Sequence, residues 1–192
     1  MFINRGFEEV VIPSIWGQDT FVSRAGEDIL GQMYAFEDKR GRPICLIPEV
    51  TGIIQDRWKA SWSKNRARPH KVFYVARCYR YERPQRGRYR EFTQFGVEVL
   101  GEDPATALPK VREELVGVLD TVGLRYRVRD AVKRGLSYYT GLGFEVECDA
   151  LGTQKQVAGG GPYPGGVGWA IGIDRLLLAL DGQGGLELPP KN

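Results

Sequence analysis

Residues 77–98 have the sequence RCYRYERPQRGRYREFTQFGVE, and this stretch decides the fold. It contains six arginines between positions 77 and 90. Aromatic and β-branched residues on both sides of the polar centre are typical of strands and predict one at 71–81 and another at 92–100. The sequence therefore predicts a β-hairpin whose loop end is strongly cationic.

The side chains on one face of this hairpin suggest a chemistry. Alternate residues of a strand share a face, so Arg80 and Glu82 point the same way, and so do Phe92, Gln94 and Glu98. Arginine offers a planar donor fork suited to phosphate, and an aromatic ring can stack on a base. Carboxylate and amide oxygens accept hydrogen bonds from an ammonium or an N–H group. A nucleotide site fits this set, while a solvated charged hairpin and a contact with a nucleic-acid backbone stay open.

The rest of the chain supplies further strands and helices. Hairpins and neighbouring strands outnumber strand–helix–strand alternation, which predicts an α+β fold with an antiparallel β-sheet flanked by helices. We expect residues 1–192 to form a single domain, since the sequence shows no repeat and no linker. The predicted elements are strands at 6–13, 33–37, 43–47, around 126, 144–147 and 167–171, a glycine- and proline-rich segment at 159–168, and helices from 51, at 104–122 and at 174–180.

Composition excludes several classes of protein. The chain has 27 Lys and Arg against 24 Asp and Glu, a net charge of +3, so affinity for phosphate depends on where the positive charges lie. Three cysteines and one histidine argue against a disulfide framework, a zinc site and a Ser-His-Asp triad. We find neither a secretory signal nor an apolar run near the ~20 residues that span a membrane. We therefore expect a reduced, cytoplasmic protein.

The hairpin segment also carries a family resemblance. From Arg80 to Glu98 it resembles motif 2 of class II aminoacyl-tRNA synthetases, in the form found in histidyl-tRNA synthetases. The resemblance extends over about residues 6–180, with the family's segments in the family's order. The other matching segments are 33–38 leading to 48–51 (amino-acid binding), 134–141 (a histidyl signature), 159–163 (glycine-rich) and 172–176 within motif 3 at about 167–180.

The resemblance implies an activity. These enzymes join histidine to the α-phosphate of ATP, giving histidyl-adenylate and pyrophosphate, and then charge tRNA. Arginines and Mg²⁺ can neutralise the charge that develops on phosphorus, so the reaction needs no protein nucleophile. The implied ligands are ATP, Mg²⁺ and histidine, with tRNA as a candidate acceptor and a homodimer as the candidate assembly. No protein side chain is singled out as a metal ligand.

The resemblance further implies which residues bind ATP. Arg80 and Arg134 match arginines at the α-phosphate and are the predicted catalytic residues. The remaining matches have separate partners: Glu82 for the adenine amino group, Arg88 for the terminal phosphates, and Phe92 and Arg175 for the two faces of the adenine ring.

A second set of matches concerns histidine. Glu49, Thr51 and Gln94 match groups that hold the substrate ammonium. Glu98 and Tyr139 match groups that bond the two imidazole nitrogens, and Tyr163 matches a residue that closes the pocket. A site built to bond both ring nitrogens would reject analogues that lack them. Taken alone, Tyr139 is better interpreted as an ordinary half-buried sheet aromatic.

The chain departs from the family in two ways. Complete enzymes carry a motif 1 helix, an inserted domain before the 134–141 signature and a C-terminal anticodon-binding domain, and we expect this chain to lack all of them. This leaves the acceptor open. Ser137, Pro162 and Pro164 replace residues usual in the family beside the imidazole pocket, which leaves the amino-acid specificity open.

Two other functions stay in competition with the enzyme. One is a non-catalytic, histidine-binding regulator resembling the regulatory subunit of ATP phosphoribosyltransferase. Retention of the ATP-site pattern at Glu49, Glu82 and Arg88 argues against it. The other is a nucleic-acid-binding module that uses the arginine loop together with a basic stretch: Lys59, Lys64, Arg66, Arg68 and Lys71.

Overall fold

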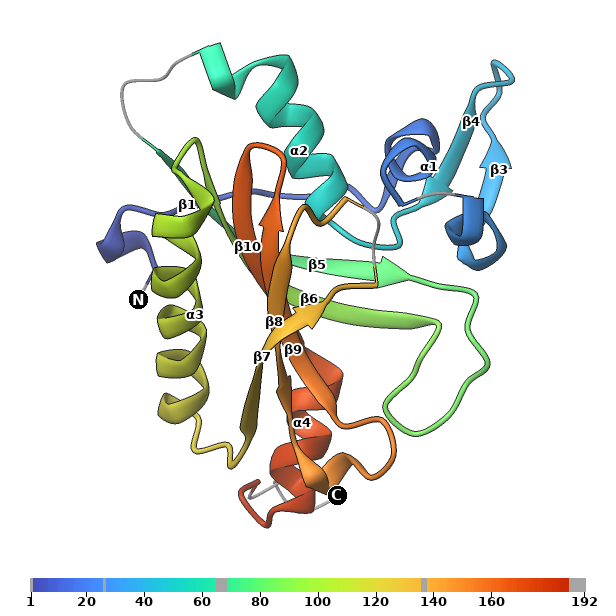
Figure 1. Cartoon of the computed structure of the whole chain (residues 1–192). Coiled ribbons are helices and arrows are strands. Elements are labelled where there is room, and N and C mark those ends of the chain that lie inside the picture. The colour runs from blue at the N-terminus through green and yellow to red at the C-terminus, as the bar shows by residue number, and fades with distance from the viewer. Residues whose placement is uncertain (1, 26, 65–68, 136–137, 187–192) are drawn as a thin grey trace.

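The predicted hairpin forms the centre of the larger of two sheets. The computed structural model describes residues 2–25, 27–64, 69–135 and 138–186 (Figure 1). Strand β5 (His70–Tyr79) pairs antiparallel with β6 (Glu91–Leu100). Regular pairing ends at Tyr79, two residues earlier than predicted, although the Arg80 amide still donates to the Arg90 carbonyl at 2.9 Å. The arginine-rich segment between the strands is therefore a long loop that begins at Arg80.

The larger sheet has the strand order β1-β5-β6-β10-β9-β8-β7. Every neighbouring pair in it is antiparallel except β1 with β5, which is parallel. The strand predicted at 6–13 contributes only two residues to this sheet, because the chain then leaves it. Val11, beyond that point, is 87% exposed. The remaining strands are β1 (Glu8–Glu9), β7 (Arg127–Lys133), β8 (Leu142–Glu147), β9 (Gln156–Tyr163) and β10 (Gly166–Gly172).

The glycine- and proline-rich segment predicted at 159–168 forms most of β9 and the start of β10. These strands lie close to their neighbours. A Cβ atom at Gly160 would lie 2.3 Å from the Gly168 carbonyl oxygen and 2.8 Å from the Trp169 Cβ. Glycine is thus required here for close packing within the sheet.

Helices cover both faces of the large sheet (Figure 1). On one face α3 (Pro104–Thr121) and α4 (Ile173–Gly182) pack against apolar residues such as Val97 and Trp169. Helix α3 begins as predicted, since the Asp103 side chain accepts a hydrogen bond from the Thr106 amide and Pro104 follows it. Within the described residues, no helix is long and apolar enough to cross a membrane.

The other face carries α2 (Thr51–Ala60) and the smaller sheet. That sheet has the order β2-β4-β3, and its β3–β4 hairpin is the one predicted at 33–47. A second apolar core lies here, which includes Ile53 and Ile54 of α2 together with Val72 and Tyr74 of β5. The bounds are β2 (Ile15–Gly17), α1 (Asp19–Ala25), β3 (Ala35–Glu37) and β4 (Pro43–Leu46), with short 3₁₀ helices at Ile3–Arg5, Glu27–Gln32, Trp62–Lys64 and Asp149–Leu151.

Strand β7 forms an irregular edge of the large sheet. Its register with β8 shifts between Arg129 and Val132, and Ala131 has a φ of 56°. Arg127, Arg129 and Lys133 are exposed along it. The edge is thus bulged and basic.

Candidate active site

A cavity of about 490 Å³ opens on the face of the large sheet that carries α2. Residues from the β5–β6 hairpin, the start of α2, the segment after β7 and the start of α4 line it. Ten of the predicted site residues lie in its wall: Glu49, Thr51, Arg80, Glu82, Arg88, Phe92, Gln94, Arg134, Tyr139 and Arg175. Segments far apart in the sequence thus converge on one site.

The hairpin supplies the floor of the cavity. The Arg80 guanidinium lies over the Phe92 ring, 5.2 Å from its centroid, and its Nε donates to the Pro48 carbonyl at 2.9 Å. Gln94 is on the same face of β6 as Phe92, and its side-chain oxygen accepts a hydrogen bond from Cys78 at 3.4 Å. A cation thus lies against the aromatic ring on this floor, with a polar group beside it.

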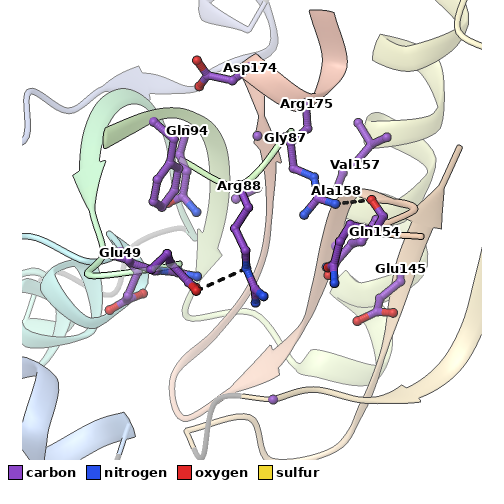
Figure 2. Close-up of a pocket in the computed structure, with 18 of the residues that line it drawn as sticks. Glu49, Gly87, Arg88, Gln94, Glu145, Gln154, Val157, Ala158, Asp174 and Arg175 are labelled. Carbon is purple, nitrogen blue, oxygen red and sulfur yellow. Dashed lines mark hydrogen bonds and ion pairs between the residues drawn. The ribbon is translucent and has the colours of Figure 1, made fainter. Parts of the chain in front are cut away.

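Three further arginines reach the cavity, each from a different element. Arg88 forms an ion pair with Glu82 at 3.3 Å, and Arg134 forms one with Glu145 at 2.5 Å. Arg175 donates to the Gln154 carbonyl oxygen. In Figure 2, Arg88 lies between Glu49 and Gln94 on one side and Gln154 and Glu145 on the other. Several fixed guanidinium groups around one space suit a ligand that carries more than one negative charge.

Arg175 is a half-buried member of this cluster, and its pKa is shifted. Desolvation, and then the positive charge of Arg88, lower the pKa of Arg175 below its usual value. Its Nε is buried without a hydrogen-bond partner. An anionic ligand between Arg88 and Arg175 would relieve their mutual repulsion.

Glu49 lies at the start of α2, where the chain turns from the smaller sheet into the helix. The Gly52 amide donates to one of its carboxylate oxygens at 2.9 Å, and the Tyr138 hydroxyl donates to the other at 3.2 Å. Burial raises the pKa of Glu49, and these hydrogen bonds together with the Arg80 charge oppose that rise. The group is therefore a fixed acceptor at the cavity wall.

Glu98 and Tyr163 do not line the cavity, unlike the other predicted residues. Both are buried, and the Tyr163 hydroxyl donates to Glu98 Oε2 at 2.7 Å. The hydroxyl of Thr51, which does reach the cavity, donates to Glu98 Oε1 at 2.8 Å. Burial raises the pKa of Glu98 to about 8. The structure thus places this pair outside the cavity lining and links it to that lining through the Thr51 hydroxyl.

Several lining residues were not predicted from the sequence. Tyr74 is buried opposite Gly96, lines the cavity and hydrogen-bonds Glu98. The sequence could have indicated Tyr74, because counting by two along the strand places it on the same face as Arg80. Tyr138, the donor to Glu49, had no pattern that separates it from a core aromatic. The group includes further polar side chains, among them Glu145, Gln154 and Asp174.

Some predicted positions cannot be placed. Leu136 and Ser137 of the 134–141 signature lie outside the described residues, as do Arg66 and Arg68 of the basic stretch. Among the residues that are described, no group of three or more His, Cys, Asp or Glu side chains could hold a metal ion.

Comparison with known proteins gives a consistent result. A model of the histidyl-tRNA synthetase family matches residues 1–129. The histidine–tRNA ligase of Methanosarcina acetivorans is 30% identical over an alignment of 280 residues, which covers 91% of this chain and 68% of the relative. Since the alignment is longer than the chain's own 192 residues, the relative has internal residues without a counterpart here.

Solved structures agree. Apo histidyl-tRNA synthetase of S. aureus has a TM-score of 0.77 at 26% identity, and the match covers 97% of this chain and 64% of that one. A Bacillus halodurans structure described as an ATP phosphoribosyltransferase regulatory subunit/histidyl-tRNA synthetase has a TM-score of 0.78 at 19% identity, a likeness of fold alone. The chain spans about two thirds of the length of the ligase and the S. aureus protein. With a family model matched over most of its length and a ligase aligned over nearly all of it, this chain belongs to the histidyl-tRNA synthetase family.

Proposed function

We propose that this chain activates histidine with ATP, forming histidyl-adenylate and pyrophosphate. The observation that supports this most is the convergence of Arg80, Phe92, Arg134 and Arg175 on one cavity that also contains Glu49. A nucleotide needs a stacking surface and cations at its phosphates, and an amino acid needs an acceptor for its ammonium group. The cavity offers all of these within one space.

The reaction is a displacement at phosphorus. A carboxylate oxygen of histidine forms a bond to the α-phosphorus, the bond from that phosphorus to the bridging oxygen breaks, and pyrophosphate leaves with the electron pair. Arg80 and Arg134 neutralise the charge on the α-phosphate, Arg88 that on the terminal phosphates, and Phe92 and Arg175 hold the adenine.

Mg²⁺ would arrive with ATP. The carboxylates that reach the cavity already accept bonds from protein donors, as Glu82 does from Arg88 and Asp174 does from the Thr93 amide. Mg²⁺ is commonly held by substrate phosphates with few protein ligands, and this donor set fits that mode. The ion would supply further charge neutralisation at the phosphates.

Histidine would occupy the part of the cavity near Glu49 and Gln94, which accept bonds from its ammonium group. Tyr139 faces the ring from the cavity wall. For Glu98 and Tyr163 we retain the proposed role at the imidazole. A carboxylate oxygen can accept more than one hydrogen bond, so Glu98 can share an oxygen between Thr51 and a ring N–H.

Histidine-dependent exchange of pyrophosphate into ATP tests the proposal. We expect exchange only when histidine and ATP are both present, and a loss of roughly 10²-fold or more in kcat for Arg80→Ala and Arg134→Ala. Arg42→Ala is the control, since Arg42 pairs with Asp38 and neither residue lines the cavity. Exchange that is unaffected by Arg134→Ala would refute the catalytic assignment.

The regulator is the second candidate, favoured by the fold shared with the Bacillus halodurans structure. Calorimetric binding of histidine without any exchange would select it over the enzyme. The relatives and the resemblance support four further proposals. We propose that the chain transfers histidine to tRNA, which an aminoacylation assay tests, and that it assembles as a homodimer, which sedimentation tests. We also propose a cytoplasmic location, tested by cell fractionation, and a single catalytic domain at 1–192, tested by limited proteolysis.

A further inference from the structure

The surroundings of Arg134 differ from those of the other cavity arginines. Its side chain is only 13% exposed although it follows directly after the edge strand β7. Its guanidinium lies 5.5 Å from the centroid of the Tyr139 ring, and its Nε is buried without a hydrogen-bond partner. Such a group is costly to bury unless something specific holds it.

Glu145 on β8 is what holds it. Nη1 of Arg134 lies 2.5 Å from Glu145 Oε1, and the Glu145 side chain is 20% exposed at the cavity wall. One carboxylate oxygen engages one guanidinium nitrogen, which leaves the other edge of the planar fork available to a ligand. Figure 2 shows Glu145 on the side of the cavity opposite Glu49.

The backbone beneath Arg134 is shaped to fit the guanidinium. Gly159 on β9 is the cross-strand partner of Glu145. A Cβ atom at Gly159 would lie 2.6 Å from Nη1 and 2.9 Å from Cζ of Arg134. The guanidinium therefore packs against the glycine backbone, and any side chain there would displace it.

We propose that Glu145 is a positioning residue, which together with the space above Gly159 fixes the Arg134 guanidinium for the α-phosphate. This inference rests on the proposed function for the identity of the anion. Two parts of it hold whatever the anion is. The orientation of Arg134 depends on Glu145, and an oriented guanidinium stabilises a developing charge better than a mobile one.

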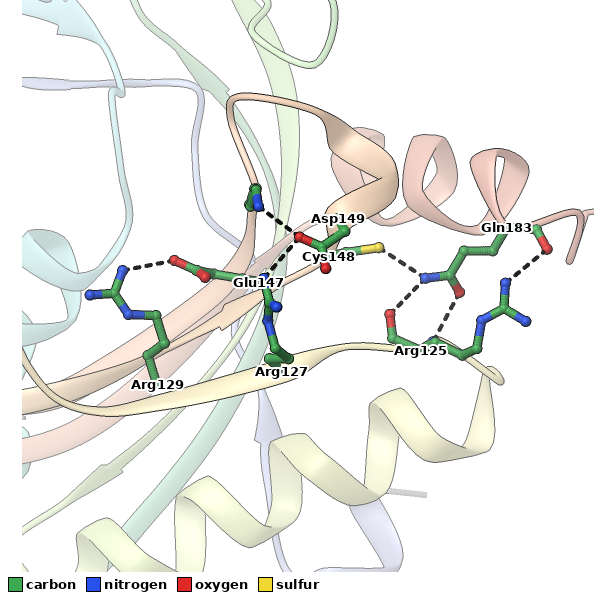
Figure 3. Close-up of polar contacts among 8 residues, drawn as sticks. Arg125, Arg127, Arg129, Glu147, Cys148, Asp149 and Gln183 are labelled. Atoms are coloured by element: carbon green, nitrogen blue, oxygen red, sulfur yellow. Dashed lines mark hydrogen bonds and ion pairs between the residues drawn. The ribbon is translucent and has the colours of Figure 1, made fainter.

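Glu147 offers a matched control on the same strand. Its side chain is 17% exposed, close to that of Glu145, and it also pairs with a single arginine, Arg129, at 2.9 Å. Figure 3 shows this pair beside Arg127 and Asp149, and none of these four residues lines the cavity. Glu147→Gln thus removes a similar ion pair without touching the site.

Exchange kinetics form the first arm of the test. We expect Glu145→Gln to lower kcat by about 10- to 100-fold, as misplaced catalytic groups do, with little change in the KM for histidine. Gly159→Ala should act in the same direction, and Glu147→Gln should match the wild type. In an Arg134→Ala background, Glu145→Gln should cause no further loss. A loss that multiplies with that of Arg134→Ala, or an unchanged kcat, overturns the inference.

Ligand binding forms the second arm and does not depend on catalysis. AMP carries one phosphate and adenosine carries none, so the Kd of adenosine divided by the Kd of AMP, both measured by calorimetry, reports the phosphate contact. Glu145→Gln and Arg134→Ala should lower this ratio, and Glu147→Gln should not. If the wild type binds both equally, or the ratio survives Glu145→Gln, the inference fails. A wild type that shows the ratio but no exchange would refute the proposed function and retain the inference.

Discussion

Glu98 is buried outside the cavity lining, where the hydroxyls of Thr51 and Tyr163 each donate to one of its carboxylate oxygens. Burial raises its pKa from 4.5 to about 8, against the opposing effect of these hydrogen bonds. Between those two values the folded protein holds a proton that the unfolded chain releases. The contribution of this group to stability therefore falls as the pH rises from about 4.5 to 8.

Replacing Glu98 with glutamine tests this titration. Because glutamine does not ionise, the free energy of unfolding of Glu98→Gln minus that of the wild type should rise with pH up to about 8. The slope can reach about 1.4 kcal/mol per pH unit for one proton. Urea unfolding at several pH values measures it. Glu49, whose pKa is also raised, is present in both proteins, so only the part of its titration that depends on Glu98 remains in the difference. A difference independent of pH would mean that Glu98 is charged in the fold.

Ten residues predicted from the hairpin and its matching segments line one cavity, whereas Glu98 and Tyr163 do not. The sequence reasoning missed lining residues whose position depends on strand pairing. Arg80 and Phe92 share a face through simple alternation and are in contact. Glu145 is near Gly159 only because β8 and β9 pair in one register. No local pattern contains that register, so the partner of Arg134 could not be predicted.

At the scale of elements, β10 passes unusually close to β6. A Cβ atom at Gly168 would lie 1.6 Å from Glu98 Oε2 and 2.7 Å from the Val97 carbonyl oxygen. Gly168→Ala should therefore lower the free energy of unfolding by about 1–3 kcal/mol through overpacking. Gly117 in α3 has nothing within 4 Å of such an atom, so Gly117→Ala should raise stability by roughly 0.5–1 kcal/mol. Denaturant midpoints compare them, and shifts of the same sign would contradict this geometry.

The helices and strands are predicted most accurately where the local sequence pattern is strongest. Helix α3 is predicted at 104–122 and found at Pro104–Thr121, because its cap and its apolar period agree. The strand predicted at 167–171 is found as β10 (Gly166–Gly172). Strand β9, which contains Gly159, Gly160 and Gly161, was not predicted as a strand, since its conformation depends on close packing between neighbours. Nothing in the sequence reasoning predicted α1 or β2, which are short.

At the scale of the molecule, the large sheet separates two apolar cores. Leu115 of α3 belongs to one core, and Ile53 of α2 belongs to the other, together with Tyr138 and Tyr163. Leu115→Ala and Ile53→Ala should each cost about 2–5 kcal/mol of stability. Only Ile53→Ala should also raise the KM for histidine in the exchange assay, because its core supports the site. Equal changes in KM for the two variants would show that the core around Leu115 supports the site as much as the core around Ile53 does, and would contradict this prediction.

The bulged edge at β7 bears on how copies of this protein meet. A regular outer strand invites another chain to add to it and start a fibril. Here the bulge at Ala131 breaks the straight row of backbone donors and acceptors, and exposed charged side chains line the edge: Arg127, Arg129, Asp130 and Lys133. Edge-to-edge aggregation through β7 is therefore disfavoured when the protein is concentrated for the assays above.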